Sequence, residues 1–188
     1  MTNVKALIFA KQSKRLPGKH LMPICGEPML KRIYHTLENT GSFEQVIVFS
    51  KYTNLEIDDR TIMRDFSHGT LINSLLNAIE KFDEFFAVGG DLPMLNSDVI
   101  YSLLKGYRGI PVAAVDFDGT IEPLFAIYNR VIHDEMLEHS LHDSQIFNFI
   151  KRRFQLVTLN RDQSSRLFNV NTSKDLETVR KILNCKDE

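Results

Sequence analysis

Short apolar runs alternate with longer segments of helical periodicity along most of the chain. The apolar runs are rich in β-branched and aromatic residues, as buried strands are, and lie at 4–10, 45–50, 85–90, 110–117, 123–128, 155–159 and 167–170. Between them, apolar residues recur every three to four positions at 28–41, 70–82 and 97–107, in two stretches within 130–151, and in a final helix capped by Thr172 or Ser173. Repeated alternation of strand and helix predicts an α/β fold.

The layering of this fold follows from the same pattern. The run "FFAVGG" at 85–90 is apolar on both faces, as a central parallel strand covered by helices requires. The Asp-Gly pair in "DFDGTIEP", 116–123, predicts a reversal into the next strand and so one antiparallel excursion. We therefore expect a three-layer sandwich with a mostly parallel, Rossmann-like sheet. The 188 residues contain no repeat or linker, which predicts a single domain, 1–188.

Composition narrows the classes of partner and compartment. With 43% hydrophobic residues, 25% charged residues and a net charge of -1, the chain has no bulk attraction to nucleic acid or to a membrane, and we expect neither partner. The first apolar run meets Lys11 at once, too early for a signal peptide or a membrane span. Cys25 and Cys185 show no CxxC spacing, which predicts buried or incidental free thiols in a reducing compartment. These features predict a cytoplasmic protein.

Positive charge is concentrated in the loop after the first predicted strand. In an open α/β sheet, ligands bind in the crevice at the carboxyl ends of the strands, and residues 11–20 leave the first strand at that point. The cationic side chains there can neutralise a triphosphate, while backbone amides near Gly18 add donors to phosphate oxygens: Lys11, Lys14, Arg15 and Lys19. The loop contains neither GxGxxG nor GxxxxGK[ST], and a solvated polar loop is the alternative.

An acidic residue follows a second predicted strand. Asp91, in "GGDLPML", comes directly after the buried run 85–90 and should face the same crevice. A carboxylate among phosphate-binding cations is suited to Mg²⁺, which takes one or two carboxylates together with phosphate oxygens and water. The alternative is that Asp91 caps the following helix, although Asn96 and Ser97 are better placed for that role.

Two amides form a third candidate group. Asn169 and Asn171 occupy alternate positions of "LFNVNTSKDLE", so a strand there would point both to one side. They either orient a metal-bound water or phosphate oxygen, or satisfy loop backbone. Two other clusters indicate no site: His139 and His142 lack a third ligand and are typical of an exposed helix end, and Asp58–Asp59 indicates a solvated turn.

Together, these stretches resemble the GT-A-like nucleotidyltransferases, and most closely the molybdenum cofactor guanylyltransferases. Ser13, Arg15 and Lys19 fall on the Ser, Arg and downstream Lys of that family's Leu-Ala-Gly-Gly-x-Ser-x-Arg-Met-Gly loop, and "CGEPML" is similar to its Gly-x-Pro-Leu. Asp65 and Gly69 fall on its Asp and Gly-Pro-Leu-Ala-Gly segment, and Asp91 on its Asp-x-Pro metal motif. "EPLFAIY" and "FNVNTSKDL" resemble its two C-terminal signatures.

The chain also departs from that family. Ala10 and Lys11 replace its glycine pair, and residues 70–73 replace its Pro-Leu-Ala-Gly. "SKRLPGK" is closer to the Ser-x-Arg-Leu-Pro-Gly-Lys of cytidylyltransferases that activate acidic sugars, with "FAK" in the place of their Pro-Ala-Arg and a loop one residue shorter. Two alternatives to guanylyl transfer are therefore a sugar cytidylyltransferase and a non-catalytic homologue that binds nucleotide.

The resemblance implies a nucleotide-diphospho-sugar transferase-like fold and transfer of GMP from GTP to molybdopterin, with release of pyrophosphate. It implies Mg²⁺ on Asp91, aided by Asn171 with Asn169, and catalytic roles for Lys19, Arg15 and Asp91. The nucleotide would be bound by Phe9, Ala10, Lys11, Gln12, Ser13, Lys19, Asp65 and Asp91. A molybdoenzyme or its chaperone is the implied transient partner.

Overall fold

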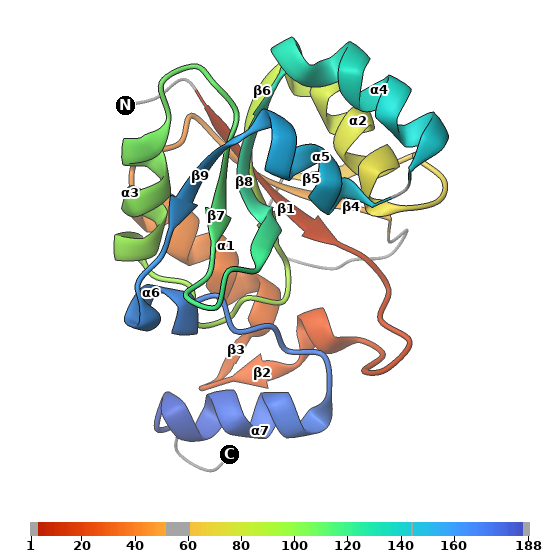
Figure 1. The fold of residues 1–188 in the computed structure, drawn as a ribbon. Helices are drawn as coiled ribbons and strands as arrows, with labels where there is room; N and C mark the ends of the chain where they lie inside the picture. Colours follow the sequence, from red (N-terminus) through yellow and green to blue (C-terminus); the bar gives the residue numbers. More distant parts are fainter. Residues whose placement is uncertain (1–3, 52–60, 144, 186–188) are drawn as a thin grey trace.

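The computed structural model describes residues 4–51, 61–143 and 145–185, and a mixed seven-stranded sheet forms the centre of this part of the chain (Figure 1). The strand order is β5-β4-β1-β6-β8-β7-β9. The strands are β1 (Lys5–Ala10), β4 (Val46–Ser50), β5 (Ile62–Arg64), β6 (Glu84–Gly89), β7 (Val112–Val115), β8 (Ile121–Asn129) and β9 (Gln155–Thr158). Strand β8 runs antiparallel to β6 and β7, whereas the other neighbours pair in parallel. The predicted α/β fold with one antiparallel excursion is confirmed.

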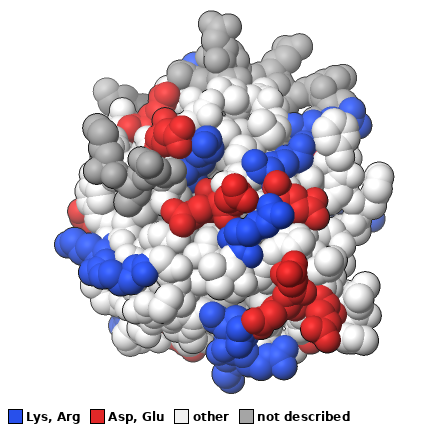
Figure 2. Space-filling model, turned by 90° about the horizontal axis from the view of Figure 1, so that it is seen from above, with Lys and Arg blue, Asp and Glu red and all other residues white. Residues whose placement is uncertain are grey.

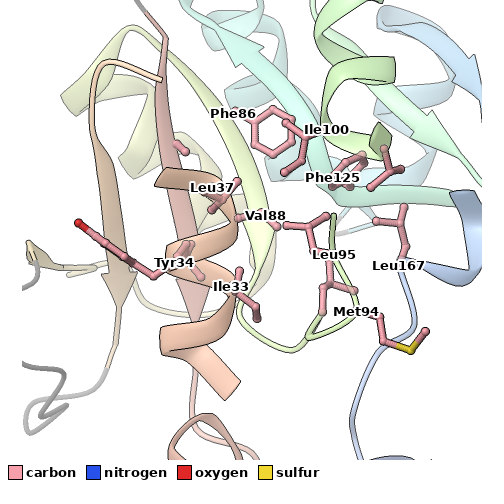
Figure 3. Packing of buried hydrophobic residues seen from close by; sticks show 14 of the residues in the cluster. Ile33, Tyr34, Leu37, Phe86, Val88, Met94, Leu95, Ile100, Phe125 and Leu167 are labelled. Atoms are coloured by element: carbon pink, nitrogen blue, oxygen red, sulfur yellow. The ribbon is translucent and has the colours of Figure 1, made fainter. Parts of the chain in front are cut away.

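Helices cover both faces of the sheet. On one face lie α1 (Met29–Asn39) and α3 (Ser97–Gly106), and on the other lie α2 (Leu71–Phe82), α4 (His133–His142) and α5 (Ile146–Arg153). Alternate residues of β1 point to opposite faces of the sheet. Ile8 packs in the first core, on the α1 and α3 face, and Leu7 packs in the second core, on the α2, α4 and α5 face. Figure 3 shows the first core, where Val88 lies among side chains from α1 and the segment after β6.

A smaller group of elements lies at the end of the molecule where the β1 loop emerges. It contains the 3₁₀ helix η1 (Lys19–Leu21), the two-stranded hairpin of β2 (Pro23–Ile24) and β3 (Glu27–Pro28), and the last helix, α7 (Ser173–Ile182). Helix α7 lies beside this hairpin, at the bottom of Figure 1. Thr172 caps α7 by accepting a hydrogen bond from the Asp175 amide, as one of the two predicted caps.

Residues 167–170 are irregular, so the strand predicted there is wrong. The run follows the short helix α6 (Arg161–Ser165), and its Val170 amide donates to the Asp91 carbonyl rather than to a sheet neighbour. Leu167 and Val170 are both buried, so the apolar pattern reflects packing over the strand ends and not a β ladder. The β2–β3 hairpin, β5 and α6 were not predicted, since each has too few residues to show a period.

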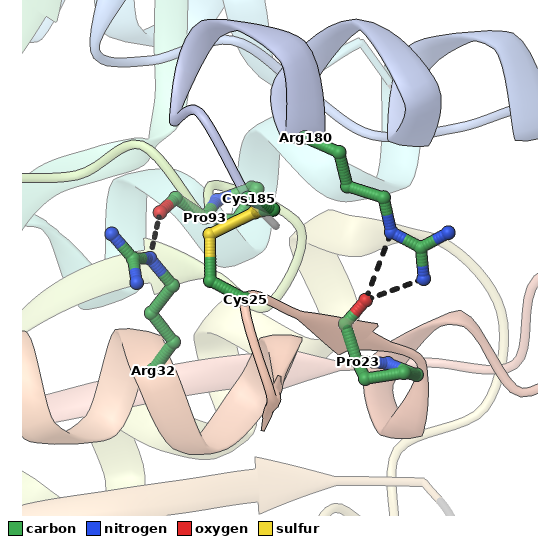
Figure 4. The surroundings of a disulfide bond; sticks show 6 residues. All are labelled: Pro23, Cys25, Arg32, Pro93, Arg180 and Cys185. Atoms are coloured by element: carbon green, nitrogen blue, oxygen red, sulfur yellow. Dashed lines mark hydrogen bonds between the residues drawn. A yellow bond between two sulfur atoms is a disulfide. The ribbon is translucent and has the colours of Figure 1, made fainter. Parts of the chain in front are cut away.

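Cys25 and Cys185 form a disulfide across a sequence separation of 160 residues (Figure 4), so the predicted free thiols are wrong. Cys25 is the first central residue of the β2–β3 turn, at φ 51°, and is followed by Gly26 at φ 80°. The C-terminal end of α7 brings Cys185 against this turn. The pairing depends on that docking, and no local spacing could reveal it.

Charges of both signs are interspersed on the face seen in Figure 2, in keeping with the net charge of -1. No helix in the described part of the chain is long and apolar enough to cross a membrane. His139 and His142 lie in the last turn of α4, and within the described residues no group of three or more His, Cys, Asp or Glu side chains is placed to hold a metal. His139 is partly buried against Phe149 rather than exposed as predicted. The Asp58–Asp59 pair lies outside the described residues.

Candidate functional site

A cleft of about 530 Å³ opens at the carboxyl ends of β1, β4 and β6. The structure places on its wall every residue predicted for the nucleotide and metal site except Asn169. These are Phe9, Ala10, Lys11, Gln12, Ser13, Arg15, Lys19, Asp65, Asp91 and Asn171. A larger and more open groove of about 850 Å³ lies along α4 and α5 and contains none of them. The residues predicted from the sequence therefore meet in the cleft at the strand ends, where α/β sheets bind ligands.

Lys19 is the central cation of this cleft. Its side chain is only 5% exposed, and its Nζ donates to Asp91 Oδ2 at 2.7 Å, the Val170 carbonyl at 2.8 Å and Asn171 Oδ1 at 3.0 Å. An ammonium group has three donors, so all of them are used. Burial of this charge is compensated by a carboxylate and two neutral oxygens.

The loop after β1 sorts its basic residues into two environments. Gly18, at φ 71°, turns the chain into η1, whose first turn closes through the Leu21 amide and the Gly18 carbonyl. The Ser13 hydroxyl accepts from the Leu16 amide and shapes the loop further upstream. Lys19 is consequently buried, while Lys14 and Arg15 stay exposed at the cleft rim.

Glycines make the room for Asp91. A Cβ atom on Gly89 would lie 2.7 Å from Asp91 Oδ1, too close for an unshifted carboxylate. A Cβ atom on Gly90 would meet the Phe9 carbonyl at 3.1 Å and the His20 ring at 3.1–3.2 Å. The helix-cap alternative for Asp91 is wrong, because Asn96 Oδ1 accepts from the Val99 amide at the start of α3.

The oxygens around the Lys19 ammonium are of the kind that binds a metal. Asp91 Oδ2 and Asn171 Oδ1 converge on the same Nζ atom, so they already face one point occupied by a positive charge. Carboxylate and amide oxygens are also the ligands that Mg²⁺ accepts in proteins. These two side chains fit a divalent cation. Asn169 does not join them, because its Nδ2 faces the Leu167 carbonyl, at 3.4 Å, once the predicted strand is replaced by irregular chain.

His20 also lines this end of the cleft, although the sequence did not single it out. Burial, reinforced by the positive charge of Lys19, lowers the pKa of His20 to about 4, and the negative charge of Asp91 opposes this shift only in part. The imidazole is therefore neutral at pH 7. Its position directly after Lys19, in the same 3₁₀ turn, was the available signal.

Asp65 and Lys51 lie at the opposite end of the cleft. Asp65 Oδ1 accepts from the Ser67 amide and from Asn77 Nδ2, each at 2.9 Å, and Lys51 Nζ lies 3.7 Å from Asp65 Oδ2. Burial by itself would raise the pKa of Asp65, but hydrogen bonds from the side chain and amide of Ser67 and from Ser74 and Asn77 lower it overall. Asp65 therefore holds the loop before α2 as a carboxylate, and Lys51, which the sequence did not indicate, carries the accompanying positive charge.

A further acid, Glu122, lies in β8, which enters the sheet at the edge that carries the cleft. Burial raises the pKa of Glu122 to about 7, and the negative charges of Asp116 and Asp91 add to the shift. The sequence contained Glu122 within "EPLFAIY" without indicating this environment.

Comparison with known proteins agrees with the fold. Residues 7–157 match the family described as the MobA-like NTP transferase domain. The chain is 26% identical over 206 residues to a probable molybdenum cofactor guanylyltransferase of Natranaerobius thermophilus, with 96% of this chain and 97% of the relative covered. It is 28% identical over 110 residues to the 3-deoxy-manno-octulosonate cytidylyltransferase of Escherichia coli, with 55% of this chain and 45% of that protein covered.

Among solved structures, the molybdopterin-guanine dinucleotide biosynthesis protein A of Archaeoglobus fulgidus superposes with a TM-score of 0.72 at 18% identity. The superposition covers 96% of this chain and 99% of that one, and it shows that the fold is shared. The family match spans most of the chain, including the end of β1, the basic loop and Asp91. This chain therefore belongs to the MobA-like NTP transferase family of nucleotidyltransferases.

Proposed function

We propose that this protein transfers GMP from GTP to molybdopterin and releases pyrophosphate. The observation that carries the proposal is the convergence of Lys19, Asp91 and Asn171 at one end of a cleft whose rim bears Lys14 and Arg15. This arrangement provides a cation site and phosphate-binding charges in one pocket. The names of the relatives from Natranaerobius thermophilus and Archaeoglobus fulgidus favour GTP and molybdopterin as the substrates.

The reaction forms a bond between an acceptor phosphate oxygen and the α-phosphorus of GTP, and breaks the bond from that phosphorus to the bridging oxygen of pyrophosphate. A phosphate monoester has a second pKa of about 6, so the acceptor is already an anion near neutral pH and no general base is needed. Catalysis then consists of positioning the two reactants and neutralising their charge. The cleft offers side chains for both tasks.

Asp91, aided by Asn171, would hold Mg²⁺, which neutralises charge on the phosphoryl oxygens when bound. Lys19 has no unused donor in the structure, so it reaches a phosphate oxygen only by exchanging one of its three partners. Asp91 is the partner to exchange, because a metal ion held by its carboxylate would compensate the negative charge that Lys19 balances in the structure. Arg15 adds a second cation from the rim for the departing pyrophosphate.

The other end of the cleft would receive the nucleoside. The backbone from Ala10 to Ser13 leaves β1 along the cleft wall, with Phe9 at its base, and supplies contacts to base and phosphate. Asp65 lies across from this segment and is the candidate partner of the base or ribose. Its low pKa keeps it an acceptor at neutral pH.

The replacement of the family's glycine pair is compatible with activity. The Ala10 side chain packs in the core on the α1 face, and the Ala10 carbonyl accepts from the Ser50 hydroxyl at 3.0 Å. Lys11 is exposed at the rim of the cleft. These positions favour an enzyme over a non-catalytic homologue, because Ala10 packs into the core and Lys11 lies at the rim.

A sugar cytidylyltransferase is the second candidate function. It is favoured by "SKRLPGK" at 13–19 and by the likeness to the Escherichia coli cytidylyltransferase. For guanylyl transfer, we further propose a cytoplasmic location, and a molybdoenzyme or its chaperone as the transient partner that accepts the product.

The thermal midpoint of the purified protein, measured with GTP, CTP, ATP and UTP with and without Mg²⁺, tests these proposals. A ligand that binds only the folded state raises the midpoint by mass action. A rise selective for GTP with Mg²⁺, followed by pyrophosphate release when molybdopterin is added, supports guanylyl transfer. The same rise with CTP supports the cytidylyltransferase, and no shift with any nucleotide contradicts both.

A further inference from the structure

The disulfide joins the two chain segments that carry Lys19 and Asn171. Lys19 lies in η1, from which the chain passes directly into the β2–β3 hairpin and its turn at Cys25. Asn171 immediately precedes the cap of α7, and α7 leads to Cys185. The bond therefore closes a loop whose two branches meet again at the contact between Lys19 Nζ and Asn171 Oδ1.

Noncovalent contacts fasten the same junction (Figure 4). Arg180 of α7 donates from Nε and Nη2 to the Pro23 carbonyl, at 3.2 and 2.7 Å. Arg32 of α1 donates from Nε to the Pro93 carbonyl at 3.0 Å, in the loop that begins at Asp91. The disulfide lies among these contacts, so the segments bearing Lys19, Asp91 and Asn171 are held in one assembly.

The backbone conformation of the turn does not favour a cysteine. Both central residues, Cys25 and Gly26, have positive φ, a conformation that favours Asn, Asp or Gly at the first position. A cysteine there has an unfavourable backbone conformation and no compensating turn hydrogen bond from its side chain. Its contribution is the bond to Cys185. Cys25 is an exposed residue and Cys185 a partly buried one, and we expect a small dithiol to reach the bond.

We propose that the Cys25–Cys185 disulfide is a positioning crosslink for the triphosphate and metal end of the cleft, and that its reduction weakens nucleotide binding. A dithiol reductant breaks the sulfur–sulfur bond by exchange, passing two electrons and two protons to Cys25 and Cys185 and becoming a disulfide itself. Most residues of the two cores come from the central sheet and the helices α1 to α5, while the hairpin and α7 contribute Ile24, Leu176 and Val179 to the first core. We therefore expect loosening to be greatest in the hairpin, η1 and α7.

The nucleotide part of this inference rests on the proposed function, so the experiment has two readouts. The first is amide hydrogen exchange in peptides covering 19–30 and 168–183, compared with peptides from β1 and β6, in oxidised and reduced protein. Reduction is expected to speed exchange at least about tenfold in the first two regions and to leave the sheet unchanged. The second is affinity for GTP with Mg²⁺ and for guanosine. GTP affinity is expected to fall about tenfold while guanosine affinity stays the same, since less preorganised phosphate-binding groups bind more weakly.

A double variant, Cys25→Ser with Cys185→Ser, is the matched control. It should behave as the reduced protein does, and adding reductant should change nothing further. Unchanged exchange in both regions on reduction overturns the proposal, as do two free thiols in protein prepared without reductant. An equal loss of GTP and guanosine affinity also overturns it, because that pattern indicates general destabilisation.

Failure of the proposed function is distinguishable from failure of the crosslink. If no nucleotide binds in either redox state, the proposed function is wrong, and exchange in the two regions together with binding of Mn²⁺ alone decides whether the disulfide positions Asp91 and Asn171. Mn²⁺ affinity that falls on reduction supports the positioning role, and equal Mn²⁺ affinity in both states contradicts it.

Discussion

Lys19 and Arg15 come from the same loop but belong to different regions of the cleft. Lys19 is buried at the inner end, where a carboxylate, an amide oxygen and a backbone carbonyl take all its donors. Arg15 and Lys14 are exposed at the rim, where water and salt screen their charge. A cation in the first environment depends on fixed partners, and one in the second acts mainly through its charge.

This difference predicts how substitutions will behave. Removing one member of a buried ion pair leaves the other charge without its partner, which is costly both to stability and to the geometry of the site. Removing an exposed charge changes the local potential by a small amount that disappears at high salt. We therefore expect larger effects from substitutions at the inner end than from substitutions at the rim.

We expect Asp91→Asn to lower kcat by about 10² or more with the fold intact, because the amide keeps the shape but lacks the charge for a metal. The measurement is turnover at saturating GTP and Mg²⁺, with circular dichroism to check folding. Asp98→Asn, an exposed acid in the first turn of α3, is the matched control and should keep full turnover. Full magnesium-dependent activity in Asp91→Asn would remove Asp91 from the site.

Lys19→Ala should weaken triphosphate binding by about tenfold or more and nucleoside binding much less, because the lost ammonium is placed for phosphate. Calorimetric titration with GTP and with guanosine separates the two. Lys14→Ala removes the same charge from the same loop at the exposed rim and is the control. Equal losses for both ligands in Lys19→Ala would contradict the assignment of Lys19 to the triphosphate.

Arg15→Ala should weaken GTP binding only about threefold, a rim effect of the size expected for an exposed charge. The loss should shrink as salt is raised from 50 to 500 mM, in assays of Kd at several ionic strengths. A salt-independent loss as large as that of Lys19→Ala would show that Arg15 makes a fixed, buried-type contact, and the distinction between the two regions would then fail.

Glu122→Gln should change the pH dependence of stability more than stability itself. Burial and nearby acids raise the pKa of Glu122 to about 7, so the folded protein retains a proton that the unfolded chain loses near its ordinary value of 4.5. The contribution of Glu122 to the free energy of unfolding of the wild type is therefore greatest below pH 4.5. It falls as the pH rises to about 7 and is constant above that. Urea titrations at pH 5 and 7.5 measure the free energy of unfolding of both proteins. Relative to the wild type, the variant should be more stable at pH 7.5 than it is at pH 5. The same change in the free energy of unfolding between pH 5 and 7.5 in both proteins would contradict the raised pKa of Glu122.

Local patterns were sufficient for most of the architecture. The periods of 2 and 3.6 that define strands and helices are read over a few neighbouring residues, so the strands β1, β4, β6 and β7 and the helices α1, α2 and α3 were predicted near their observed limits. Residues 167–170 show where this fails, because burial by distant elements produces the same apolar pattern without a ladder. The hairpin at Cys25 was missed because two-residue strands have no period.

The sequence by itself determined the α/β fold and placed Asp91 and the loop that bears Lys19 at the same edge of the sheet, because the carboxyl ends of parallel strands must share one edge. Only the tertiary structure decided which loop cation is buried, since the acceptors of Lys19 come from residues 91, 170 and 171. It likewise separated Asn171 from Asn169 and paired two cysteines 160 residues apart. Such contacts depend on how segments far apart in the sequence pack together, and local sequence patterns do not indicate which of these segments meet.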